Sequence, residues 1–194
     1  CNFILPYRNW EEPIEPGIRK YLKNKYSWVP ELLKQGIPAK KVIDSVMSGF
    51  HYRFVSETRN FYPGALSIFQ FDRSRLGLCD DAVTYFVNVF RSVGIACSNE
   101  YIPQWGTHHT NGHSWLYFQY GDEEIALDAG GDGLDVRIKY SGESIPKVYR
   151  RTYGQEKRES LFREGRDVTS FYRPVVELEM DLDDVLIDTI TKYT

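Results

Sequence analysis

The sequence contains few sulfur-bearing residues and only a small excess of negative charge. It holds three cysteines and two methionines in 194 residues, and 24 Lys and Arg face 27 Asp and Glu for a net charge of −3. An odd number of cysteines without paired spacing does not predict a disulfide framework. Without clustered basic residues the chain lacks the positive face that phosphate backbones require, so we expect no nucleic-acid partner.

Long hydrophobic runs are missing as well. No uninterrupted apolar stretch approaches the ~20 residues that cross a bilayer, so we expect no membrane segment. No internal repeat or low-complexity stretch is present. The fractions of apolar residues (42%) and charged residues (26%) are those of an ordinary globular domain with a packed core. The length suits one domain better than two.

The chain begins at Cys1, and residues 3–8 that follow it have the pattern of ordered structure. We therefore expect a fragment of a larger multidomain protein. The alternative is the lipidated first residue of a mature bacterial lipoprotein, which would more often be followed by a polar tether.

Hydrophobic periodicity predicts helices first and strands afterwards. Helical spacing covers residues 13–36, with Pro30 as an interruption, and a further helix opens at Pro38. Residues 51–71 are irregular, with a turn at Pro63-Gly64. A third helix begins at Cys79 and ends before Gly94, a left-handed cap. Strands are then expected at 95–102, 113–120, 124–128 and 168–182, with a turn at Gly121-Asp122 and no assignment for 133–166. This order predicts an α+β fold.

Cys79 stands where an apolar helix begins. The positive end of the helix dipole and the free N–H groups there favour a thiolate and could bind an oxyanion. Asp80 and Asp81 suit a helix start but disfavour the thiolate, so an imidazolium partner is needed. A buried structural thiol is the alternative interpretation of Cys79. Cys97, inside a predicted strand, is interpreted as a core residue.

His113 and Asp128 are predicted neighbours. His113 begins one predicted strand, and Asp128 closes the next strand along the chain. In an antiparallel hairpin the start of one strand lies beside the end of the other. A carboxylate beside an imidazole fixes its tautomer and stabilises the imidazolium, so the sequence predicts a Cys79–His113–Asp128 triad.

These segments resemble the transglutaminase-like superfamily, in particular the transglutaminase-like cysteine hydrolases of Bacteroidetes. The similar motifs are Gly77-x-Cys79-x-Asp81 with the helix up to Arg91-Ser92-Val93-Gly94, then Gly112-His113-Ser114-Trp115, and Ile125-Ala126-Leu127-Asp128. Tyr101-Ile102-Pro103-Gln104-Trp105 and the upstream Leu5-Pro6-Tyr7-Arg8 resemble the same proteins. The strong similarity covers about residues 74 to 130.

The resemblance implies a papain-like, transglutaminase-like core, in which the nucleophile helix packs on an antiparallel sheet. It implies a catalytic domain over residues 1–166 and a strand segment over 167–194 that leads to, or docks on, a following β module. It also implies a bacterial protein of the cell envelope or extracellular space that acts on a peptide or protein substrate without a cofactor. Tyr101, Gln104 and Trp105 are the candidate substrate-binding residues, and Gln70 is a candidate oxyanion donor.

Three functions remain open at this stage. Cysteine-dependent hydrolysis of peptide or protein amides is favoured, and the alternatives are a protein-crosslinking transglutaminase and a non-catalytic binding module on the same fold. An acetyltransferase would need an acyl-coenzyme A site that the sequence does not offer.

We expect no metal site. His108, His109, His113 and Cys79 could suggest zinc, but His109 and His113 share a face only on a helix, which Thr110-Asn111-Gly112 disfavours. Asp128, Asp132 and Asp135 depart from the spacing of a calcium loop.

Overall fold

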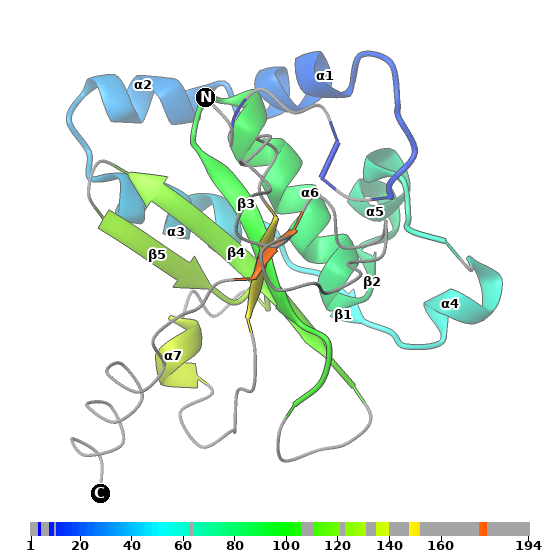
Figure 1. Cartoon of the computed structure of the whole chain (residues 1–194). Helices are drawn as coiled ribbons and strands as arrows, with labels where there is room; N and C mark the ends of the chain where they lie inside the picture. The colour runs from blue at the N-terminus through cyan, green and yellow to red at the C-terminus, as the bar shows by residue number, and fades with distance from the viewer. Residues whose placement is uncertain are drawn as a thin grey trace, which may run out of the picture.

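The computed structural model describes residues 4, 8–9, 11–62, 64–105, 111–120, 123–130, 135–139, 148–151 and 175–177. The elements follow one another as α1 (Ile18–Lys25), α2 (Trp28–Lys34), α3 (Ala39–Ser48), β1 (Arg53–Phe54), α4 (Thr58–Phe61), α5 (Ile68–Ser74), β2 (Leu76–Gly77), α6 (Cys79–Ser92), β3 (Cys97–Ile102), β4 (His113–Tyr120), β5 (Glu123–Leu127), α7 (Val136–Lys139), β6 (Tyr149–Arg151) and β7 (Val175–Glu177). Helices and an antiparallel sheet thus make up a mixed fold (Figure 1).

The main sheet has five strands in the order β5-β4-β3-β6-β7, and every neighbouring pair is antiparallel. Helix α6 packs against β3 and β4, while α1 and α5 pack against α6 (Figure 1). A short parallel pair, β1 with β2, places Phe54 opposite Gly77. Since β2 runs directly into α6, this pair fixes the chain just before Cys79.

Alternation along the strands gives the sheet two buried faces. Leu116 and Phe118 point to the α6 side and join the main core. Trp115 points to the opposite side, into a smaller core with Ile102, Val136 and Val148. His113, two residues before Trp115, therefore starts β4 on the side of the smaller core.

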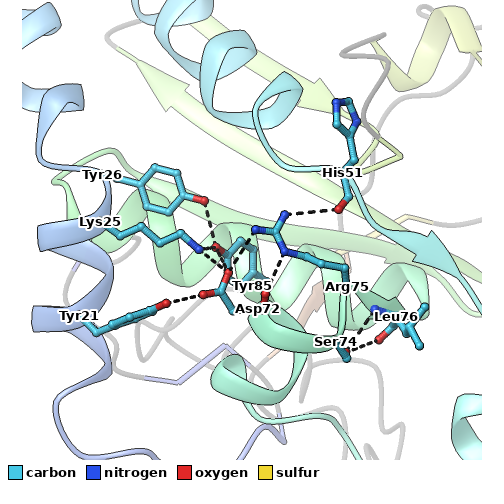
Figure 2. A network of polar contacts seen from close by, with 9 residues as sticks. All are labelled: Tyr21, Lys25, Tyr26, His51, Asp72, Ser74, Arg75, Leu76 and Tyr85. Atoms are coloured by element: carbon cyan, nitrogen blue, oxygen red, sulfur yellow. Dashed lines mark hydrogen bonds and ion pairs between the residues drawn. The ribbon is translucent and has the colours of Figure 1, made fainter.

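A cluster centred on Asp72 joins α1, α5 and α6 (Figure 2). Oδ1 of Asp72 accepts hydrogen bonds from Lys25 at 2.5 Å and from the Tyr85 hydroxyl at 2.8 Å, and Oδ2 accepts one from the Tyr21 hydroxyl at 2.5 Å. Burial alone would raise the pKa of Asp72, but these three donors outweigh it and lower the pKa. The Asp72 cluster thus holds an ionised carboxylate where three helices meet.

Arg75 extends the Asp72 cluster toward the short parallel pair. Its Nε donates to the backbone carbonyl of Asp72 at 2.9 Å, and its Nη1 donates to the carbonyl of His51 at 3.3 Å (Figure 2). Arg75 has a φ of 55°, a left-handed conformation that closes α5 and redirects the chain into β2. The contacts of its guanidinium help to hold that turn.

Several predicted elements are confirmed. The helix from Cys79 ends at Ser92, Gly94 has a φ of 88°, and β4 spans His113–Tyr120 as expected. The helix after Pro38 is α3, and Cys97 is fully buried in the main core. The strand predicted at 95–102 begins two residues later, at Cys97. The strand predicted at 124–128 begins one residue earlier, at Glu123, and ends at Leu127.

Other predictions need correction. Pro30 does not interrupt a helix but lies in the first turn of α2, where a missing N–H costs nothing; the break falls at Tyr26-Ser27. The stretch 51–71 that was predicted as irregular contains β1, α4 and the start of α5. The unassigned stretch 133–166 supplies α7 and β6. The turns at Pro63 and at Gly121-Asp122 lie outside the described residues.

The C-terminal strand pairs with the sheet of the domain. Val175–Glu177 forms β7, which is antiparallel to β6 with Tyr149 opposite Glu177. The division of the chain at residue 166 stays a prediction. Within the described part of the chain, no helix is both long and apolar enough to cross a membrane.

Candidate active site

Cys79 is the first residue of α6 and is a half-buried free thiol. Asp81, two residues on, turns its buried carboxylate back to the chain before the helix. Its Oδ2 accepts from the backbone N–H of Leu78 at 2.8 Å and its Oδ1 from that of Leu66 at 3.2 Å. Asp81 therefore closes the N-terminus of α6 and fastens the chain at Leu66 beside it.

Gly77 makes room for this carboxylate. A Cβ at Gly77 would lie 2.8 Å from Oδ2 of Asp81 and 2.9 Å from Cε2 of Phe71, closer than such contacts occur. The glycine of the Gly77-x-Cys79 motif thus serves the packing of the helix start, because any side chain would displace Asp81.

Asp80 contacts the sheet instead. Its Oδ1 accepts a 2.5 Å hydrogen bond from the hydroxyl of Ser114, a buried residue of β4. The first turn of α6 is therefore attached directly to the start of the strand that carries His113.

His113 and Asp128 are side by side, as the hairpin argument predicts. The β4–β5 pairing sets Leu116 opposite Leu127, so Asp128 lies diagonally from His113 on the same face. Nε2 of His113 is 3.3 Å from Oδ2 of Asp128, which is 3% exposed.

The charge state of His113 follows from its partners. Burial alone lowers the pKa of His113, but hydrogen bonding and charge interactions with Asp128 and with Cys79 outweigh it and raise the pKa to about 9. The imidazolium form is therefore favoured at neutral pH. Because Cys79 contributes to this pKa, it lies near His113 and Asp128, and the catalytic role of the three residues stays a prediction.

Two tryptophans flank the imidazole. The ring of His113 stacks on Trp105 with centroids 5.8 Å apart, and it is tilted against Trp115 at 6.2 Å. The indole Nε1 of Trp115 donates to the buried carboxylate of Glu100 at 2.7 Å, which Arg150 pairs at 2.7 Å. This arrangement restricts the ring of His113 and ties Trp115 to β3 and β6.

Asp128 has further partners beside His113. The backbone N–H of Gly130 donates to its Oδ1 at 2.7 Å, and Nζ of Lys139 lies 3.1 Å from its Oδ2. Lys139 comes from α7, which lies against β5.

Tyr52 is also near the cluster. It immediately precedes β1, is half-buried, and packs its ring on Phe71 with centroids 5.4 Å apart. Burial raises the pKa of Tyr52, and the negative charges of Cys79, Asp128 and Asp81 raise it further. Its hydroxyl therefore stays protonated and can only donate toward a neighbouring negative charge.

The candidate substrate-binding residues differ in their surroundings. Trp105 is half-buried against His113, and Gln104 is exposed just after β3. Tyr101 is buried and stacks on Tyr149 at 5.5 Å. Their part in substrate binding stays a prediction. Gln70 contributes its side-chain carbonyl to the capping box of α5, where it accepts from the backbone N–H of Ser67 at 2.9 Å.

Among the described residues, no three His, Cys, Asp or Glu side chains gather as metal ligands would. His108, His109 and Asp132, which entered the zinc and calcium alternatives, lie outside that part of the chain.

Three polar residues around the cluster cannot be predicted from the sequence. Ser114 was noted only as part of the strand motif, although it follows His113 directly. Tyr52 and Lys139 lie in stretches for which hydrophobic periodicity gave no element, so no signal located them.

No protein-family model matches the chain. No curated protein matches it either. Among solved structures, it is similar to a provisionally assigned cysteine protease from Cytophaga hutchinsonii, with 16% identity and a TM-score of 0.40 over 66% of this chain and 40% of that one. It is also similar to the periplasmic domain of TgpA from Pseudomonas aeruginosa, with 14% identity and a TM-score of 0.41 over 62% of this chain and 46% of that one. The chain thus spans less than half the length of either structure.

Proposed function

We propose that this chain is a cysteine-dependent acyl-transfer enzyme that hydrolyses peptide or protein amides. Cys79 is the nucleophile, His113 is the general acid and base, and Asp128 orients His113. The observation that carries the proposal is the imidazole of His113, whose Nε2 lies 3.3 Å from Oδ2 of Asp128 and whose pKa is raised to about 9 by its interactions with Asp128 and Cys79.

The first half of the reaction forms the acyl-enzyme. The thiolate of Cys79 attacks the amide carbonyl carbon, and the negative charge passes to the carbonyl oxygen. The N–H groups at the start of α6 are suited to stabilise that oxyanion. The imidazolium of His113 then gives its proton to the amide nitrogen, the C–N bond breaks, and the amine leaves.

The second half releases the acyl group. His113, now neutral, takes a proton from water, and the oxygen of that water attacks the thioester. The C–S bond breaks, the carboxylic acid leaves and gives its proton to solvent, and the thiolate of Cys79 is restored with the imidazolium beside it. If a lysine amine took the place of water, the product would be a cross-link, so the acceptor distinguishes hydrolase from transglutaminase.

The test combines a peptide library with mass spectrometry. We expect new carboxyl termini or deamidated side chains, no change on addition of a millimolar primary amine, and complete loss in Cys79→Ala. Cys97→Ala is the matched control, since it removes the buried thiol and should leave the products unchanged. Incorporation of the amine would favour the transglutaminase. If the folded chain gave no product with any peptide, and Cys79 reacted with alkylating agents no faster than an exposed thiol, the binding module would be favoured.

A further inference from the structure

Asp128 contacts two cationic groups through one oxygen. Oδ2 lies 3.1 Å from Nζ of Lys139 and 3.3 Å from Nε2 of His113, while Oδ1 accepts from the N–H of Gly130 at 2.7 Å. Since the carboxylate is almost fully buried, water does not screen these contacts strongly. The lysine contact is as close as the histidine contact.

Lys139 is held at this position by the backbone. It ends α7, its N–H donates to the carbonyl of Asp135 at 2.9 Å, and Asp135 forms a bridge with Leu127, the residue before Asp128. Val136 of the same helix is buried in the smaller core. The short helix is therefore anchored to the strand that ends at Asp128.

The chain leaves room for this ion pair at Gly130. A Cβ there would lie 3.2 Å from Oδ1 of Asp128 and 3.2 Å from Nζ of Lys139. These distances are tighter than most Cβ contacts, so a side chain at this position would press on both partners at once.

We infer that Lys139 is a positioning residue for Asp128. Lys139 holds the carboxylate ionised and oriented, and it weakens the stabilisation that this carboxylate gives to the imidazolium of His113. This inference rests on the proposed function, in which Asp128 orients the general base. A carboxylate opposite His113 alone would stabilise the imidazolium fully. A second cation on the same oxygen opposes that effect, so neutral His113, which deacylation needs, becomes available at lower pH.

Among the described residues, charged or titratable groups approach His113 from several elements. Glu100 of β3 and Arg150 of β6 pair with each other beside Trp115. The first turn of α6 brings Cys79, Asp80 and Asp81, and the segment before β1 brings Tyr52, whose hydroxyl stays protonated. None of these four side chains can carry a positive charge. Lys139, from α7, is the cation that the described part of the structure sets on Asp128.

The experiment is a histidine NMR titration of the full chain in four forms: wild type, Lys139→Met, Lys139→Arg and Lys34→Met. Lys34 is the matched control, because it is an exposed lysine paired with Glu31 on α2, far along the chain from the site. The signal of His113 is assigned from His113→Gln. We expect Lys139→Met to raise the measured pKa of His113 by roughly one unit, as the loss of a nearby cation predicts. Lys139→Arg and Lys34→Met should leave it within about 0.2 of wild type, a margin that screened charges allow.

An unchanged or lowered pKa of His113 in Lys139→Met would overturn the inference. Should that variant fail to fold by circular dichroism, Lys139→Gln takes its place. The titration needs no substrate, so it can succeed even if the proposed hydrolysis is wrong. Where hydrolysis is found, the acid limb of the kcat profile should move upward by the same amount in Lys139→Met, with KM unchanged.

Discussion

The hydroxyl of Ser114 donates a 2.5 Å hydrogen bond to Oδ1 of Asp80. Each of the two residues is the sequence neighbour of a proposed catalytic residue, His113 in one case and Cys79 in the other. The contact therefore sets the distance between the nucleophile helix and the strand of the base. It also gives the carboxylate of Asp80 a hydrogen-bond donor. From the sequence alone, that carboxylate is expected to disfavour the thiolate of Cys79.

Ser114→Ala should loosen this connection. We expect kcat to fall roughly tenfold, since small displacements of catalytic groups have effects of this order or larger, while the free energy of unfolding falls by about 1 kcal/mol. Steady-state kinetics and urea unfolding measure the two quantities. Loss of stability without any loss of kcat would show that the contact serves folding alone.

Alkylation at pH 6 tests the pairing of Cys79 with His113. The imidazolium should favour the thiolate, so limited iodoacetamide should label Cys79 well before the buried Cys97. In His113→Ala the rate should fall roughly tenfold, as expected for the loss of one close charge. Asp128→Asn should lower turnover more than labelling, because Asp128 orients the base and does not attack. Equal labelling of Cys79 in wild type and His113→Ala would contradict the ion pair.

Stability at alkaline pH gives a second measure of His113. Its pKa is raised from 6.5 to about 9 in the folded chain, so the folded state holds the proton more tightly. The contribution of His113 to the free energy of unfolding is then fully present below pH 6.5, declines as the pH rises, and is lost above about pH 9. Urea unfolding of wild type and His113→Gln should differ most at low pH and converge above pH 9. A difference that is constant from pH 6 to pH 10 would be incompatible with this shift.

Gly77 and Gly112 test whether close backbone packing sets the site. A Cβ at Gly112 would lie 2.3 Å from the carbonyl oxygen of Ile102, and one at Gly77 would lie 2.8 Å from Asp81. We expect Gly112→Ala and Gly77→Ala each to cost about 2 kcal/mol or more of stability and to lower turnover. Gly64→Ala is the control, since nothing lies within 4 Å of its Cβ position. Equal stability of the three variants would show that the backbone at Gly77 and Gly112 adjusts freely.

Asp72 should govern stability at acid pH. Its pKa is lowered in the folded chain, so its stabilising contribution is present above its ordinary value of 3.8 and is lost as the pH falls through and below that value. Asp72→Asn should cost about 2–3 kcal/mol at pH 7, because Lys25, Tyr21 and Tyr85 lose a charged acceptor. The cost should shrink as the pH falls toward 2. Asp44→Asn, in an exposed pair with Lys40, should show a much smaller cost. A loss in Asp72→Asn that does not depend on pH would argue against an ionised carboxylate.

The sequence predicts the long elements α6 and β4 better than the short elements around them. The apolar stripe after Cys79 and the alternation in 113–120 have the two clear periods of helix and strand, and both elements follow these bounds. The nearness of His113 and Asp128 follows from the hairpin alone. By contrast, β1 and β2 have two residues each, and α7 has four, which is too short for any period to show.

The residues that surround the cluster were missed for the same reason. Lys139 reaches Asp128 through a short helix whose position depends on the Leu127–Asp135 bridge. Tyr52 depends on a parallel pairing between two-residue strands. Neither relationship leaves a local pattern in the sequence, because each is decided by contacts between distant segments.

The two described cysteines differ in burial, so their rates of modification can report on opening of the fold. Cys79 is half-buried at a helix start, whereas Cys97 is fully buried and desolvation raises its pKa. In Cys1→Ser, modification of Cys97 under native conditions would require the sheet to part from α6, while Cys79 reports only on the site. The ratio of the two rates therefore separates variants that damage the chemistry from variants that destabilise the whole domain, in one sample and without denaturant.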